Sequence, residues 1–382
     1  MAMTAESGAP FDLPSLSPLS LQVRRTAGEV VGRPAELRAI GEEIASAKAG
    51  RLTALTLEGE PGIGKTRLLT TAKDMAIAEG FMAVAVTADE EIKGPFLLAR
   101  AIFACARQQS SGTPAESALQ RVTEAISGSD DPGLETLASD TKLLRVFDFA
   151  AVAIRAAASA KPLALLVDDL QWGDEDSVRL LRYGVRANAD LPIFMLLAVR
   201  PEEAAVVTEL TNLIADMQRM GLVRRLSLGR FSQTEAAALL EQTLKANVAA
   251  ASAATMNEQA EGVPFILEEL ARTYRDTGMI QMIDGAWTLA RNAARLVPSS
   301  VKTLIQRRSA RLPDATRQVL AEAAILGRAF SLKDLRALKL KLGCPEEECT
   351  STALAEALDP AASAGLLEEL PESSPADYRF SH

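Results

Sequence analysis

The chain has 382 residues, of which 48% are hydrophobic and 24% are charged, the composition of an ordinary globular protein. This length allows about two or three domains, each with its own core. The 41 Lys and Arg residues against 50 Asp and Glu residues give a formal net charge of −9. This acidic balance argues against a broad nucleic-acid-binding surface on the chain.

The cysteines and the apolar runs indicate the compartment. Cys105, Cys344 and Cys349 are too few for a disulfide framework, and the last two have no further Cys or His partners for a zinc site. No apolar run reaches the ~20 residues that span a bilayer. Residues 1–21 lack the charged and apolar regions of a signal peptide. We therefore expect a cytoplasmic protein with no membrane partner.

The first 50 residues predict a tail followed by a helix. Residues 1–25 mix Ser, Pro, Gly and Ala without periodicity, which predicts a flexible N-terminal tail. Pro34 suits the first position of a helix, and Gly50 can end it. The apolar positions between them share one helical face: Leu37, Ile40, Ile44 and Ala47.

A Gly-x-x-x-x-Gly-Lys-Thr pattern lies between a β-prone run at 52–57 and a helical run that begins near Lys65, the context of a phosphate-binding P-loop. Glycines let the backbone turn tightly toward a phosphate, and the helix N-terminus favours the anion. Lys65 supplies a positive charge for the β- and γ-phosphates, and the Thr66 hydroxyl can bind Mg²⁺. The other interpretation is a glycine-rich turn with a surface lysine. The predicted nucleotide-binding residues here are Gly59, Glu60, Pro61, Gly62, Ile63, Gly64, Lys65, Thr66 and Arg67.

The second motif is the apolar run 163–167, which is followed by Asp168 and Asp169. A buried strand with two carboxylates at its tip is typical of a Walker B motif, in which the first carboxylate holds Mg²⁺ and the second orients or deprotonates the attacking water. The alternative is a pair of helix-capping aspartates. The position about 100 residues after a P-loop favours the Walker B interpretation.

Two further apolar strands flank this motif, at 81–87 and 193–199, and the residues 94–160 are predicted to be mostly helical. Arg200 follows the second of these strands. An arginine at this tip points to where a γ-phosphate would lie, and it could distinguish ATP from ADP. The competing interpretation is a salt bridge to Glu202, Glu203 or the Walker carboxylates.

Beyond Pro201 the alternation of strands and helices is expected to stop. A capping box at Ser232–Glu235 opens a helical cluster at 232–276, which Gly262-Val263-Pro264 interrupts, and residues 279–289 predict a hairpin with an Asp284-Gly285 turn. Later helical patterns, which begin with 301–311 and 313–326, and a terminal two-stranded ribbon indicate a winged-helix domain. The predicted fold is α/β, a P-loop NTPase core with a parallel sheet followed by a helical lid and a winged-helix domain. The predicted boundaries are 1–25 (tail), 26–205 (core), 206–295 (lid) and 296–382 (winged helix).

With these motifs in hand, the chain resembles the STAND class of AAA-like signalling ATPases, in particular the nucleotide-binding module of large ATP-binding LuxR-type bacterial regulators. The resemblance covers about residues 28–382. It rests on the segments Val31–Leu37, Gly59–Thr66, Leu165–Trp172, Ala198–Pro201, Glu261–Leu270 and Tyr378–His382.

The resemblance implies further site residues. The segment Val31, Gly32 and Arg33 would lie on the adenine side, Pro264 in the Gly-x-Pro motif of the lid would pack on the base, and Arg200 would read the terminal phosphate. His382 resembles a histidine that contacts the phosphates of bound ADP in the wider class. The alternative for His382 is a frayed terminal residue without a partner. The implied ligands are ATP or ADP and Mg²⁺.

The main functional hypothesis is a slowly hydrolysing molecular switch, closed with ADP and opened by ATP exchange, which exposes a surface for self-association. Relatives continue past the segment that ends here at His382, so the chain resembles a fragment. An unknown inducer or sensor domain, and DNA contacted only through an output domain outside this chain, are therefore expected partners. The alternatives are an AAA+-type remodelling motor and a small-molecule kinase, for which no substrate motif is found.

Overall fold

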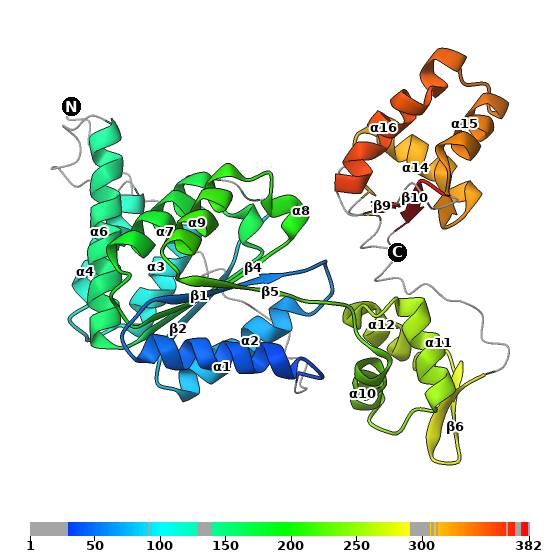
Figure 1. The fold of residues 1–382 in the computed structure, drawn as a ribbon. Helices are drawn as coiled ribbons and strands as arrows, with labels where there is room; N and C mark the ends of the chain where they lie inside the picture. The colour runs from blue at the N-terminus through cyan, green and yellow to red at the C-terminus, as the bar shows by residue number, and fades with distance from the viewer. Residues whose placement is uncertain are drawn as a thin grey trace, which may run out of the picture.

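The computed structural model describes residues 30–90, 92, 94–127, 139–290, 306, 309–310, 312–363, 366–370 and 376–380. The first part of the chain forms a parallel sheet with the strand order β2-β3-β4-β1-β5 (Figure 1). The strands are β1 (Thr53–Glu58), β2 (Met82–Thr87), β3 (Leu163–Asp168), β4 (Ile193–Val199) and β5 (Val223–Ser227). This arrangement confirms the predicted α/β fold of P-loop NTPases.

Helices cover both faces of the sheet, which explains why the inner strands read as continuous apolar runs. One face carries α1 (Pro34–Lys48) and α2 (Lys65–Ala78), and Ile40, Leu69 and Phe194 lie in the core beneath them. The other face carries α3 (Leu97–Gln109), α4 (Glu116–Ser127), α6 (Ser139–Ala160), α7 (Glu175–Ala187) and α9 (Thr208–Arg219) (Figure 1).

The alternation of strands and helices does not stop at Pro201, and this prediction was wrong. After the short α8 (Pro201–Ala204), α9 leads into β5, which pairs with β1 along Ala54↔Val223 to Glu58↔Ser227. The sheet core therefore extends past the predicted boundary at 205. The sequence signal is weak because Arg224 and Arg225, which are exposed, break the apolar run of β5.

The segment after β5 folds as a helical unit, which we call the lid: α10 (Gln233–Leu244), α11 (Ala250–Ala260) and α12 (Pro264–Asp276). The capping box that opens α10 is confirmed, since the Ser232 and Glu235 side chains each bond the other's backbone. The hairpin of β6 (Ile280–Ile283) and β7 (Ala286–Leu289) is confirmed too. Its turn residues Asp284 and Gly285 have φ values of 50° and 80°, as a two-residue hairpin turn requires.

The last described part, which we call the C-terminal unit, contains α14 (Asp314–Leu326), α15 (Leu332–Lys341) and α16 (Ser351–Ser363). Its strands β8 (Ala329–Phe330), β9 (Leu367–Glu369) and β10 (Tyr378–Phe380) form an antiparallel sheet in the order β8-β10-β9. The predicted ribbon is β9 and β10, and β8 adds a third strand. Most of the helix predicted at 301–311 lies outside the described residues.

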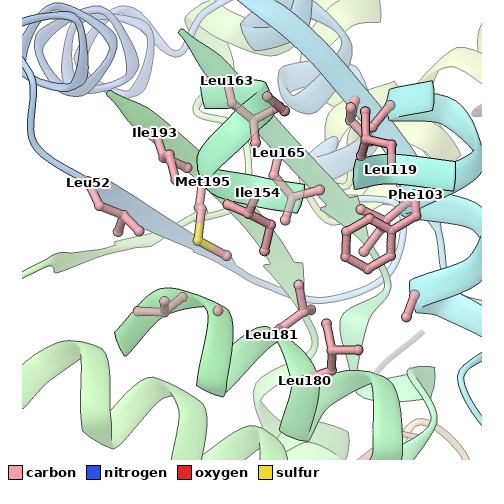
Figure 2. A pocket seen from close by; sticks show the side chains of 17 residues that line it. Leu52, Phe103, Leu119, Ile154, Leu163, Leu165, Leu180, Leu181, Ile193 and Met195 are labelled. Atoms are coloured by element: carbon pink, nitrogen blue, oxygen red, sulfur yellow. The ribbon is translucent and has the colours of Figure 1, made fainter. Parts of the chain in front are cut away.

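An apolar cavity of about 50 Å³ lies between the sheet and the helices α3, α4, α6 and α7. Figure 2 shows Met195 and Leu165 of the sheet facing Ile154, Leu181 and Phe103 across it. A cavity with this lining stays dry, and at ~24 cal/mol per Å³ it lowers the stability of the fold by about 1 kcal/mol.

Candidate nucleotide-binding site

The P-loop joins β1 to α2 and has the backbone that its glycines allow. Gly62 and Gly64 have φ values of 80° and 105°, in the left-handed region. A Cβ on Gly62 would lie 3.1 Å from Phe265 Cβ, so a side chain there would also push the lid away. As predicted, α2 begins at Lys65, so the first free N–H groups of the helix face the loop.

Lys65 is 6% exposed and turns back over the P-loop. Its Nζ donates to the carbonyl oxygens of Gly59, at 2.6 Å, and of Glu60, at 3.2 Å. Burial lowers the pKa of the Lys65 ammonium, and the nearby charges of Asp169 and Asp168 oppose this shift. The ammonium therefore lies within the loop that is expected to hold the phosphates.

Thr66 and Asp168 meet at the carboxyl end of the sheet. The Thr66 hydroxyl donates to Asp168 Oδ2 at 2.5 Å, and the backbone N–H of Asp169 donates to Asp168 Oδ1 at 3.0 Å. Asp168 is 3% exposed, and burial raises the pKa of its carboxyl. A hydroxyl and a carboxylate are the hard oxygen ligands that Mg²⁺ prefers.

The described part of the chain holds no group of three His, Cys, Asp or Glu side chains able to bind a metal by themselves. Mg²⁺ at nucleotide sites takes one or two protein ligands and completes its shell with water and substrate phosphates. The hydroxyl of Thr66 and the carboxylate of Asp168, the predicted metal ligands, are oxygen donors of the kind that such an ion takes.

Asp169 and Arg200 lie side by side at the tips of β3 and β4. Arg200 Nε is 3.4 Å from Asp169 Oδ1, and its Nη1 bonds Glu203 Oε1 at 2.8 Å. The guanidinium carbon lies 4.4 Å from the centre of the Trp172 ring, within cation–π range. The structure thus contains the salt bridges that were one interpretation of Arg200, and it places the same side chain next to the second Walker carboxylate.

The segment before α1 lies between the P-loop and the lid. Arg33 is 6% exposed, has a φ of 62°, and donates from Nη2 to the Gly229 carbonyl at 2.5 Å. Its guanidinium carbon is 4.9 Å from the centre of the Phe231 ring. Val31 packs on the lid core, and a Cβ on Gly32 would lie 2.8 Å from Glu235 Oε1. The Arg33 side chain therefore holds the segment that follows β5.

The lid touches the P-loop directly through the start of α12. Pro264 is buried at the first position of this helix, and the next N–H, that of Phe265, donates to the Gly62 carbonyl at 3.2 Å. Arg67 Nη1 forms an ion pair with Glu268 Oε1 at 2.7 Å, and the side chains are 27% and 13% exposed. The predicted residues Pro264 and Arg67 are thus brought together, whereas the roles of Phe265 and Glu268 were not anticipated.

A second set of ion pairs joins the P-loop to both later units. Arg230 binds both oxygens of Glu60, at 2.7 and 3.0 Å, and its Nη1 binds Glu261 Oε2 at 3.0 Å. Glu261 also pairs with Arg328 of the C-terminal unit. The bonds to Glu60 raise the pKa of Arg230. We call Glu60, Arg230, Glu261 and Arg328 the ion-pair chain; only Glu60 was a predicted site residue. His382 lies outside the described residues.

A loop-to-helix phosphate cradle, paired with a carboxylate at the end of a second parallel strand that β4 separates from β1, defines a nucleotide-binding protein with the P-loop NTPase fold. Residues 29–196 match the family model described as the AAA ATPase domain, which includes both motifs. This match supports nucleotide binding and hydrolysis in general. In the described part of the chain, no helix is both long and apolar enough to cross a membrane.

Among solved structures, the chain is similar to a Walker-type ATPase of Pyrococcus abyssi, with a TM-score of 0.50 and 14% identity over 92% of this chain and 93% of that one. It is also similar to a STAND protein with a tetratricopeptide repeat sensor from Pyrococcus horikoshii, with a TM-score of 0.40 and 12% identity over 92% and 41% of the two chains. At these identities, the first likeness shows the fold alone.

Among curated proteins, an uncharacterized protein of Rhizobium meliloti (strain 1021) is 24% identical over 393 residues. This alignment covers 94% of the present chain and 35% of the relative, so the chain spans about a third of the length of the relative it matches.

Proposed function

We propose that the protein is an ATP-binding and slowly hydrolysing regulatory switch of the STAND type. In this proposal, ADP holds a closed resting state, and exchange for ATP opens the module and exposes a surface for self-association. The observation that carries the proposal is that one loop, Gly59–Thr66, contacts the lid at Gly62 and the ion-pair chain at Glu60. A loop with these contacts can transmit its own state to both later units.

The residues of the site have separate parts in this proposal. The P-loop N–H groups and the Lys65 ammonium bind the phosphates, and Asp169 accepts a proton from the attacking water. Arg200 senses the terminal phosphate, for which it must give up part of its pairing with Asp169 and Glu203. Thr66 and Asp168 would hold Mg²⁺, which supplies charge neutralisation at the phosphates.

Two contacts would let the lid respond to the nucleotide. The Gly62 carbonyl accepts from Phe265, so a rearrangement of the loop around a phosphate moves the start of α12. Arg67 projects from the first turn of α2 to Glu268 and so ties the phosphate-binding helix to the same lid helix. A lid helix that is bound both to the loop and to the helix after it follows their conformation, which is the coupling that a switch needs.

The remaining parts of the proposal rest on the resemblance to LuxR-type regulators. Val31, Gly32, Arg33 and Pro264 would face an adenine base, the C-terminal unit would act as a winged helix, and His382 would touch the ADP phosphates. An unknown inducer or sensor domain would be a further partner, and DNA would be contacted only through an output domain outside this chain. The proposed location is the cytoplasm.

The deciding experiment measures hydrolysis and assembly on the full chain. We expect slow turnover, a monomer with ADP, and a larger species by light scattering with a non-hydrolysable ATP analogue. Fast turnover that is independent of any partner or assembly would contradict the switch. Rings that form regardless of the nucleotide would favour the AAA+-type motor instead.

A further inference from the structure

Gln171 lies between the two groups that the proposed function uses at the strand tips. It belongs to the short 3₁₀ turn Leu170–Trp172, directly after the Walker B strand, and is 5% exposed. Its amide nitrogen donates to Asp169 Oδ1 at 2.9 Å. Its amide oxygen accepts from the backbone N–H of Arg200 at 3.2 Å. Both ends of a buried carboxamide are thus used on opposite sides of the same site.

The donor contact fixes which oxygen of Asp169 is available. Among the described residues, all side-chain partners of Asp169 lie on Oδ1: the Gln171 amide and the Arg200 Nε. Oδ2 is left as the acceptor for a water. Asp169 also has a φ of 50°, a left-handed conformation that is costly for a residue with a side chain. The bond from Gln171, two residues on, helps to hold this conformation.

The acceptor contact fixes the tip of β4. The Arg200 Nε is buried, and its 3.4 Å approach to Asp169 is an ion pair without the alignment of a hydrogen bond. The hydrogen bond from the Arg200 backbone N–H to the Gln171 amide oxygen therefore helps to fix the position of the Arg200 backbone, from which the side chain extends. One amide orients the carboxylate, and the same amide anchors the backbone of the arginine.

We propose that Gln171 is a positioning residue that orients Asp169 toward the attacking water and couples this carboxylate to the Arg200 end of β4. This inference rests on the proposed ATPase function and adds a residue that touches neither phosphate nor metal. Its effect on hydrolysis is exerted through Asp169.

Two substitutions separate the contacts. Gln171→Glu keeps the shape and the acceptor for the Arg200 N–H, but it replaces the donor to Asp169 by a second negative charge. Gln171→Met keeps the length and loses both contacts. A packing role predicts that Glu is tolerated better than Met. A positioning role predicts that Glu is at least as harmful as Met, because two carboxylates in contact repel each other.

The measurements are kcat for ATP hydrolysis and the Kd for ATP, made on the full chain. We expect both Gln171 variants to lower kcat by about 30-fold or more while the Kd changes by less than about threefold. In an Asp169→Asn background, either Gln171 variant should lower kcat no further, because the group it orients is gone. Gln109→Leu is the control, since the Gln109 amide bonds the Ala83 carbonyl outside the site.

The outcomes are distinguishable. A wild-type protein that does not hydrolyse ATP overturns the proposed function together with the inference. An Asp169→Asn variant with the wild-type rate overturns the proposed role of Asp169 and the inference. An inactive Asp169→Asn variant combined with a wild-type kcat for Gln171→Glu overturns the inference alone. If Gln171→Met fails to fold, Gln171→Glu and its double variant with Asp169→Asn decide the matter.

Discussion

Two regions meet at the P-loop and are held in different ways. The strand tips that carry Asp168 and Arg200 belong to fully buried parallel strands with apolar cores on both faces. The lid is held to the same loop by one backbone bond from Phe265 and by ion pairs with partly exposed arginines. Buried strands resist movement, whereas each exposed ion pair contributes little to stability. We therefore expect the strand tips that carry Asp168 and Arg200 to stay in place and the contacts between the lid and the P-loop to change.

The largest expected effect lies on the rigid side. Lys65→Ala removes the only lysine of the phosphate cradle, so we expect the ATP affinity to fall by about 100-fold or more. A calorimetric titration measures this. Lys48→Ala is the control, because Lys48 pairs with Glu79 on an exposed surface. Wild-type affinity in the Lys65 variant would contradict the assignment of the P-loop.

The two Walker carboxylates sharpen the comparison within the rigid region. Asp169→Asn should retain ATP binding and lower kcat by about 100-fold or more, because the amide cannot accept the proton. Asp168→Asn should weaken binding only when Mg²⁺ is present. ATP titrations with and without Mg²⁺, combined with rates, separate the two. Equal effects of both variants on Mg²⁺-dependent binding would mean that the roles are not divided as proposed.

A smaller effect is expected where the lid joins the loop. Arg67→Ala should speed release of a fluorescent ADP analogue by about fivefold, the equivalent of about 1 kcal/mol for a partly exposed ion pair. Glu268→Gln should have the same effect, and the double variant no more than either, since both break one contact. Arg272→Ala is the control, because it removes a neighbouring partner of Glu268 that does not reach the P-loop. Additive effects would mean that the pair does not close the lid.

The smallest effect concerns the cavity behind the rigid strands. Ala157→Val adds methyl groups to its lining and should stabilise the fold by up to ~1 kcal/mol, measured by urea unfolding. Ala158→Val is the matched control: Ala158 is equally buried on the same helix but does not line the cavity, so extra volume there should destabilise. Equal destabilisation by both variants would show that the cavity is closed in solution.

The strands that were predicted from the sequence are those with strong local patterns. The strands at 81–87, 163–167 and 193–199 were recognised because buried parallel strands are continuous apolar runs. The strand β5 was missed because its two exposed arginines, Arg224 and Arg225, break the apolar run. The same reason made the core boundary at 205 too early, since the residues up to Ser227 join the sheet only by pairing with β1.

By itself, the sequence determined the P-loop and the Walker B strand, because each is a strand followed by a short loop whose chemistry depends on neighbouring residues. Only the tertiary structure decided what surrounds them. Arg67 and Glu268 are 201 residues apart in the chain, Glu60 and Arg230 are 170 apart, and Gln171 and the Arg200 N–H are 29 apart. No periodicity links such positions, since each contact depends on how the sheet, the lid and the C-terminal unit pack together.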